Sequence, residues 1–176
     1  MALVVLLRGV NVGGHRTFRP TTLARQLRHL DAVNIGAAGT FVIRRPGTRA
    51  QLRASLARRL PCDTEIVICD GREIARLMAL DPFGGTPLRP DIVRFVSVLA
   101  RRPRHAPTTP LRLPSSGAWQ LRILGRDNRF VFGVYRRQMK VIGHLGTFDR
   151  LFGVPVTTRS WKTITVIAGV LGHGEK

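Results

Sequence analysis

Residues 33–43 read VNIGAAGTFVI. Two short runs of β-branched and aromatic residues, Val33–Ile35 and Phe41–Ile43, flank the small residues 36–39, a pattern typical of two strands joined by a turn. Helix-like and strand-like segments stand on both sides of this pair. The way in which the pair joins them decides the fold class.

On the N-terminal side, residues 2–8 form a continuous apolar run, which predicts a buried strand. Pro20 suits the first turn of a helix, because its fixed backbone dihedral is already helical. Leu23, Leu27 and Leu30 then recur at helical spacing, so we expect a helix between the first strand and the pair.

On the C-terminal side, Thr48 and Gln51 form a capping box for a helix whose leucines at 52, 56 and 60 make one apolar stripe. Glu65–Cys69 then predicts another strand. The resulting order, strand-helix-strand-strand-helix-strand over residues 2–69, is the split βαβ, or ferredoxin-like, pattern.

A further helix is expected from Asp70, with Glu73 as its capping partner, and it should stop before Pro82. The proline- and glycine-rich residues that follow predict a linker. We therefore predict an N-terminal subdomain at 1–82, a linker at 83–90 and a C-terminal subdomain at 91–176.

The second half also mixes strands and helices. Ile92–Leu99 predicts a strand, Arg101–Pro114 an extended basic loop, and residues 119–134 a hairpin that turns at 126–128. A helical stripe ends at Gly153, a candidate left-handed cap, and a last helix is expected around 164–171. The fold class predicted is α+β, in two small mixed subdomains.

Charge is the strongest compositional signal. Twenty-nine Lys and Arg stand against ten Asp and Glu, a formal net charge of +19 and a pI near 11.9. Such a chain attracts polyanions, which favours nucleic-acid binding. However, most of these cations are arginines spread along the whole chain, and arginine with abundant Ala, Gly and Pro is also what a GC-rich genome encodes. Both interpretations stay open.

The segment LLRGVNVGG, residues 6–14, has glycines at the two glycine positions of the phosphate-loop pattern GxxxxGK[ST]. His15 and Arg16 then stand where lysine and a hydroxyl residue are required, so Walker-type nucleotide binding is not expected. Two interpretations remain: a looser anion site formed by the amides and side chains of Gly13, Gly14, His15 and Arg16, or a tight turn in which Asn11 bonds the backbone.

The segment Thr157–Trp161 is predicted to be a loop in which Ser160 caps the following helix. Hydroxyls and a guanidinium beside free helix amides suit phosphate or carboxylate, although a capped helix with a packed Trp161 explains the same residues. Our first hypothesis is an anionic ligand held between the two subdomains by Arg8, Asn11, Gly13, Gly14, His15, Thr158, Arg159 and Trp161.

Enzyme and metal signatures are weak. No nucleophile–base pair can be assigned, and the histidines and the two cysteines, Cys62 and Cys69, lack metal-ligand spacing. We expect no metal and no cofactor, and the oligomeric state is undefined. The apolar runs are too short to span a bilayer and no signal peptide is evident, which predicts a cytoplasmic protein without membrane partners.

The second hypothesis is a non-enzymatic protein that binds nucleic acid, without sequence specificity, through its arginine-rich surface. RNA-binding ferredoxin-like sheets carry aromatic residues on their central strands. Here residues 39–44 share only Phe41-Val42 with such a strand, and aromatic residues make up 6% of the chain. Base stacking on this sheet is therefore poorly supported.

LLRGVNVGG together with GVPVTTRSW, residues 153–161, resembles the two ends of an uncharacterised bacterial domain-of-unknown-function family, and residues 33–43 resemble its strand-turn-strand. The resemblance implies a two-lobed α+β protein with no established activity. In two loops, at His15-Arg16 and at 142–147, this chain lacks a lysine that the family pattern carries, which weakens an anion site inferred by analogy.

Overall fold

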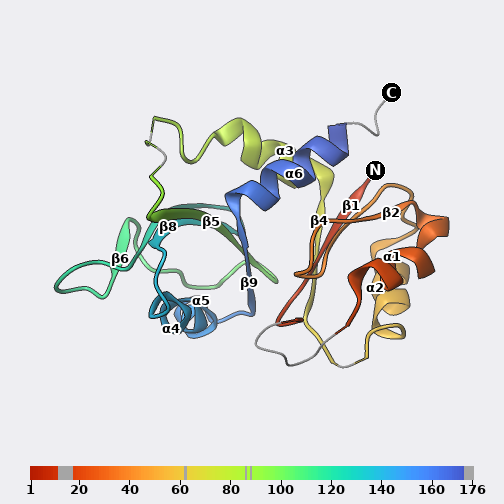
Figure 1. Ribbon diagram of the computed structural model, residues 1–176, viewed down its shortest axis with the longest axis horizontal. Coiled ribbons are helices and arrows are strands. Elements are labelled where there is room, and N and C mark those ends of the chain that lie inside the picture. The colour runs from red at the N-terminus through yellow and green to blue at the C-terminus, as the bar shows by residue number, and fades with distance from the viewer. Residues whose placement is uncertain (12–17, 62, 86, 88, 173–176) are drawn as a thin grey trace. The chain divides into compact units, whose positions relative to one another are not determined.

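The computed structural model describes residues 1–11, 18–61, 63–85, 87 and 89–172, and its fold class is α+β, as predicted (Figure 1). Spatial proximity of Cα atoms divides the chain into two units. Unit 1 is Met1–Arg76 with Thr165–Lys176, and unit 2 is Leu77–Ile164. Whether the predicted segments 1–82 and 91–176 are separate folding domains stays a prediction.

Unit 1 contains a four-stranded antiparallel sheet with the order β2-β3-β1-β4. This order and the alternation of strands and helices confirm the ferredoxin-like pattern predicted for residues 2–69. The elements are β1 (Leu3–Leu7), α1 (Pro20–Gln26), the 3-10 turn η1 (Arg28–Leu30), β2 (Ala32–Asn34), β3 (Thr40–Ile43), α2 (Arg49–Ala57) and β4 (Ile66–Asp70).

Two local signals act as the sequence predicts. The Thr48 Oγ1 accepts a hydrogen bond from the Gln51 backbone N at 3.1 Å, and the Gln51 Oε1 accepts one from the Thr48 N at 2.9 Å, which completes the capping box. Gly39 has φ +71, and a Cβ there would come within 2.8 Å of the Leu7 Cβ. Only glycine therefore allows the turn to approach β1 so closely.

The sheet of unit 1 is buried on both faces. One face packs against α1 and α2 through leucines such as Leu23 and Leu52, with Phe41 at the centre of this core (Figure 1). Val4, Leu6 and Val42, which alternate with the residues of that core, are also fully buried. The strands of this sheet therefore read as continuous apolar runs rather than as alternating ones.

Unit 2 contains a five-stranded antiparallel sheet with the order β6-β7-β8-β5-β9. Its strands are β5 (Ile92–Leu99), β6 (Leu111–Leu113), β7 (Leu121–Asp127), β8 (Phe130–Arg136) and β9 (Val156–Ser160). Helices α4 (Val141–Gly146) and α5 (Phe148–Phe152) also belong to it. Helix α3 (Gly71–Leu80) begins in unit 1 and ends in unit 2, and α6 (Trp161–Gly172) does the reverse.

Two sequence predictions for this half are wrong. The predicted loop over Arg101–Pro114 contains β6, because Leu111 and Leu113 alternate with Arg112 and pack on the core of unit 2. The predicted loop before the last helix is instead β9, where β-branched residues pair with β5 in antiparallel register. The hairpin and the left-handed Gly153, with φ +65, are confirmed.

One face of the unit 2 sheet packs on α4 and α5. Leu121, Ile123 and Val131 share this core with Phe148, and the rings of Phe95 and Phe148 have their centres 6.0 Å apart. The alternate residues of β6, β7 and β8 point to the opposite face. These residues include Arg112, Arg122 and Arg136, beside the buried Phe130 and Val134.

Candidate nucleic-acid interface

The sequence-predicted residues of the N-terminal loop are only partly described. Gly13, Gly14 and His15 lie outside the described residues. Arg8 follows β1, is half-buried, and its backbone N donates to the Glu65 O at 3.0 Å.

Asn11 is held by the backbone on both sides. Its Nδ2 donates to the Ala37 O at 2.9 Å, and its Oδ1 accepts a hydrogen bond from the Phe18 N at 2.9 Å. Asn11 also has φ +55, a conformation that asparagine tolerates in turns. These contacts are those expected of a turn residue, and ligand binding by Asn11 stays a prediction.

In unit 2, the predicted residues Thr158, Arg159 and Trp161 already have protein partners. The Thr158 Oγ1 lies 2.6 Å from the Ser97 Oγ, and the Arg159 Nη1 donates to the Thr158 O at 2.9 Å. Trp161 packs edge-on against Phe83, with ring centres 5.1 Å apart. Burial lowers the pKa of Arg159 to about 10, so this guanidinium is still a cation at neutral pH.

The end of β9 shows two further polar features. The Ser160 Oγ accepts a hydrogen bond from the Thr163 N at 3.2 Å, which confirms Ser160 as the cap of α6. The Thr157 side chain is 2% exposed, and among the described residues its Oγ1 has no hydrogen-bond partner. A buried hydroxyl without a partner costs about 1–3 kcal/mol of desolvation.

Arg8 and Asn11 belong to unit 1, whereas Thr158, Arg159 and Trp161 belong to unit 2. A single anion site formed by both segments therefore stays a prediction.

The sequence analysis missed a group of arginines on the second face of the unit 2 sheet. We call it the arginine face and define it as Arg94, Arg112, Arg122 and Arg136. Arg112 on β6 lies directly opposite Arg122 on β7, Arg122 lies opposite Val134 on β8, and Val134 lies opposite Arg94 on β5. Three arginines thus stand in one row across four strands.

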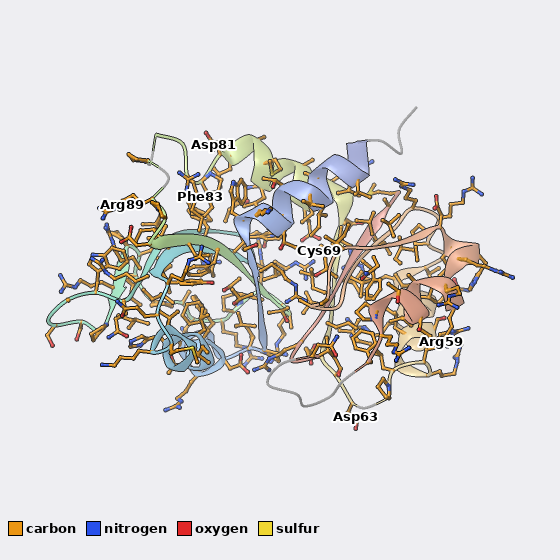
Figure 2. The ribbon with its side chains drawn as sticks, in the orientation of Figure 1. Arg59, Asp63, Cys69, Asp81, Phe83 and Arg89 are labelled. Atoms are coloured by element: carbon orange, nitrogen blue, oxygen red, sulfur yellow. The ribbon has the colours of Figure 1, made fainter. Side chains whose placement is uncertain are left out.

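Aromatic rings support this face. The Cζ of Arg122 lies 5.3 Å and that of Arg136 4.5 Å from the centre of the Trp119 ring. The Cζ of Arg94 lies 5.6 Å from the centre of the Phe83 ring, and Phe83 packs over β5 and β8 (Figure 2). Cation–π contacts of this kind hold guanidiniums in place at a surface.

Carboxylates are scarce in this unit. Unit 2 holds fifteen Arg and Lys but only four Asp and no Glu. The Asp91 carboxylate forms ion pairs with two cations at the margin of the arginine face. Its Oδ2 lies 3.6 Å from the Arg136 Nη1, and its Oδ1 lies 3.1 Å from the Arg89 Nε. Like charges directly opposite in a sheet are destabilising, and the Arg112–Arg122 pair is such a case.

The sequence indicates on which face of the sheet Arg112 and Arg122 lie. In Leu111-Arg112-Leu113 and Leu121-Arg122-Ile123, the alternation predicts that each arginine lies opposite the core face. What the alternation does not supply is the register that sets Arg112 against Arg122. That register also depends on β6, which the sequence analysis assigned to a loop.

The unit 1 sheet offers no comparable surface. Phe41, the one aromatic residue that resembled an RNA-binding strand, is fully buried in the core. The exposed arginines of unit 1 include Arg53 and Arg72 on helices, and a shallow hollow of about 650 Å³ is lined by Gln26, Arg58 and Arg59. Arg59 lies on the outside of unit 1 (Figure 2), and its Nη1 donates to Ser55.

The described residues contain no group of three or more His, Cys, Asp or Glu able to hold a metal ion, and Cys69 is a buried cysteine. None of their helices combines the length and the apolar composition needed to cross a bilayer.

A family model described as "Protein of unknown function (DUF1697)" matches residues 1–127. The matched region contains LLRGVNVGG and VNIGAAGTFVI and ends with the last residue of β7. GVPVTTRSW lies beyond it, so the assignment of that segment to the family stays a prediction. No curated protein and no solved structure matches the chain.

Proposed function

The chain belongs to the DUF1697 family of proteins of unknown function, and we propose that it is a non-enzymatic protein that binds nucleic acid, without sequence specificity, through the arginine face of unit 2. The observation that carries the proposal is the row of Arg112, Arg122 and Arg94 in strand register. The proposal also places the protein in the cytoplasm, where nucleic acid is available.

The strand register matters because it shows that positive charge is concentrated at one place on the surface, which the net charge of the chain alone does not show. Arginines encoded by a GC-rich genome need only reach solvent, and they do so most easily on helices, as Arg53 does in unit 1. Arg112 and Arg122 instead stand directly opposite each other on neighbouring strands, both exposed, an arrangement in which like charges are expected to repel. The Arg112 Nη2 donates to the Gly117 O, and the Arg122 guanidinium lies over Trp119. A bound polyanion would relieve that repulsion and release its own counterions.

The chemistry of the face suits phosphate. A guanidinium offers a planar fork of donors that matches phosphate oxygens in two-pronged contacts. The contacts go to the backbone of the nucleic acid and carry no sequence information, so we expect little discrimination among sequences.

The test is the salt dependence of binding, followed by fluorescence anisotropy of labelled mixed-sequence oligonucleotides. If all four arginines contact phosphates of a single strand, log K should fall with log[salt] with a slope of about −3. Arg112→Glu/Arg122→Glu should weaken binding at least about a hundredfold, which corresponds to two lost charge-assisted contacts.

The matched control is Arg53→Glu/Arg72→Glu, which makes the same change in net charge on exposed helical positions of unit 1. We expect this control to weaken binding only a few-fold, through the general field of the protein. Equal losses in the two double variants would show that net charge, rather than the arginine face, attracts nucleic acid. Absence of binding by the wild type near physiological salt would reject the proposal.

A second candidate, binding of a small phosphate-like anion by the Thr157–Trp161 segment, rests on the buried Thr157 Oγ1 that has no partner among the described residues. If an anion accepts a hydrogen bond from this hydroxyl, phosphate should raise the Tm of the wild type but not that of Thr157→Val. If none does, the isosteric valine should raise the stability by about 1 kcal/mol with or without phosphate. Thr157→Ser, which keeps the hydroxyl, is the control.

A further inference from the structure

We propose that the nucleic acid bound by the arginine face is single-stranded and that an unpaired base stacks on the Trp119–Arg122 pair. This inference rests on the function proposed above and adds the class of nucleic acid. Its basis is an aromatic ring set among the arginines, a feature that phosphate binding alone does not require.

Trp119 is held in position by its neighbours. The Arg136 Nε donates to the Trp119 O at 3.0 Å, and the Arg136 N donates to the Gln120 O at 2.8 Å. On the other side, the Gln120 N donates to the Leu113 O at 2.8 Å, and the Gln120 Oε1 lies 3.2 Å from the His144 Nε2. The backbone that carries the indole is thus tied to two strands and to α4, which presents the ring in a fixed place.

The two guanidiniums near the ring differ in freedom. Arg136 is about one-third exposed and is held by the Trp119 carbonyl oxygen, by Asp91 and by the indole itself. Arg122 is exposed and lies 5.3 Å from the ring centre. Arg136 is therefore a positioning residue, and the solvent side of the Trp119–Arg122 pair is where a planar group can stack.

A duplex gains little from such a surface. In double-stranded nucleic acid the faces of the bases are covered by their neighbours, and only edges and phosphates are accessible. An unpaired base presents its face, and every base stacks on an aromatic ring or an arginine plane without sequence preference. A single strand could place one phosphate at Arg112 and Arg122 and the adjoining base on Trp119. It would then contact both the indole ring and the row of arginines.

The test compares three ligands of equal length at one salt concentration: a mixed-sequence single strand, its duplex, and an abasic strand with the same phosphates but no bases. We expect the single strand to bind wild type about tenfold more tightly than the abasic strand, as one stacked base provides. Trp119→Leu should bring this ratio close to one while the salt slope stays unchanged. Trp119→Phe should retain most of the preference.

Two further measurements keep the inference testable if Trp119→Leu folds poorly. Trp emission of the wild type should be quenched by the single strand but not by the abasic strand. Arg122→Lys keeps the charge but removes the planar guanidinium, so it should preserve the salt slope and lower the preference for the single strand.

Equal binding of the single and abasic strands by the wild type would overturn this inference while leaving the proposed function intact. Retention of the preference in a folded Trp119→Leu variant would also overturn it. Failure of all three ligands to bind would instead reject the proposed function itself.

Discussion

The two sheets of this protein differ in the residues that their two faces carry. In unit 1, both faces of the sheet are apolar and buried, so β1, β3 and β4 carry almost no polar side chains. In unit 2, one face packs on α4 and α5, while the other is apolar and buried over the middle of β5 and β8 and bears arginines on β6, on β7 and at the end of β8. Among the described residues, a row of arginines across a sheet therefore occurs in unit 2 and not in the unit that follows the familiar ferredoxin-like pattern.

This difference changes where a nucleic-acid interface should be sought. On fold-level analogy, the ferredoxin-like sheet of unit 1 is the natural platform, and Phe41 is its aromatic candidate. Because Phe41 is fully buried, it stabilises the core and cannot meet a ligand. The arginines and Trp119 of unit 2 instead stand on a sheet whose topology the sequence did not suggest for this role.

The comparison can be tested most strongly in the core of unit 1. Phe41→Ala should lower the free energy of unfolding by about 3–5 kcal/mol, because it removes a fully buried ring. Urea denaturation followed by circular dichroism measures this loss. Phe132→Ala, at a half-buried position of unit 2, should cost clearly less.

Phe41→Ala also distinguishes a loss of stability from a loss of affinity for nucleic acid. The folded fraction of Phe41→Ala should bind oligonucleotides as the wild type does, since the arginine face belongs to unit 2. A loss of affinity that exceeds the loss of folded protein would assign part of the interface to unit 1, and the contrast between the two sheets would then fail.

A smaller effect is expected at the row itself. Arg112→Glu places opposite charges directly across β6 and β7 but also removes the hydrogen bond that the Arg112 Nη2 donates to the Gly117 O, so we expect a net gain of less than about 1 kcal/mol of stability at low salt. Affinity for nucleic acid should fall about tenfold or more in the same variant, because a phosphate contact becomes a repulsion.

Thermal unfolding at low and high salt checks the first effect, since screening should remove most of the gain. Arg126→Glu, an exposed change on the same strand as Arg122 but outside the row, is the matched control. If the difference in stability between Arg112→Glu and the wild type does not change with salt, the two arginines do not repel each other appreciably. The position of Arg112 opposite Arg122 would then no longer support the proposal that a phosphate binds there.

Much of unit 1 was accessible from the sequence because its signals are local. Pro20 begins α1, Thr48 and Gln51 form the capping box, and the small residues at 36–39 turn the chain. Each signal depends on neighbours within a few residues, so it acts before any tertiary contact forms. The contacts of Asn11 are of another kind, since its side chain joins Phe18 to Ala37, a residue 26 positions further along the chain.

The errors share one physical cause. The three-residue strand β6 lies between Pro110 and Pro114, and β9 contains threonines and an arginine, so neither has the apolar run that predicts a strand on its own. Both are strands because a longer neighbour, β7 or β5, supplies hydrogen-bond partners along their length. The residues of such a short strand do not themselves indicate that a neighbouring strand will pair with them.

The sequence by itself determined the α+β class, the order of elements in unit 1, the cap of α6 and the large positive charge. Only the tertiary structure decided that Phe41 is enclosed, that Arg112 faces Arg122, and that Trp119 receives two guanidiniums. Periodicity and capping are properties of a single segment, whereas register and burial belong to segments far apart in the chain. The candidate interface consists of the second kind of property, which is why it emerges from the fold and not from a motif.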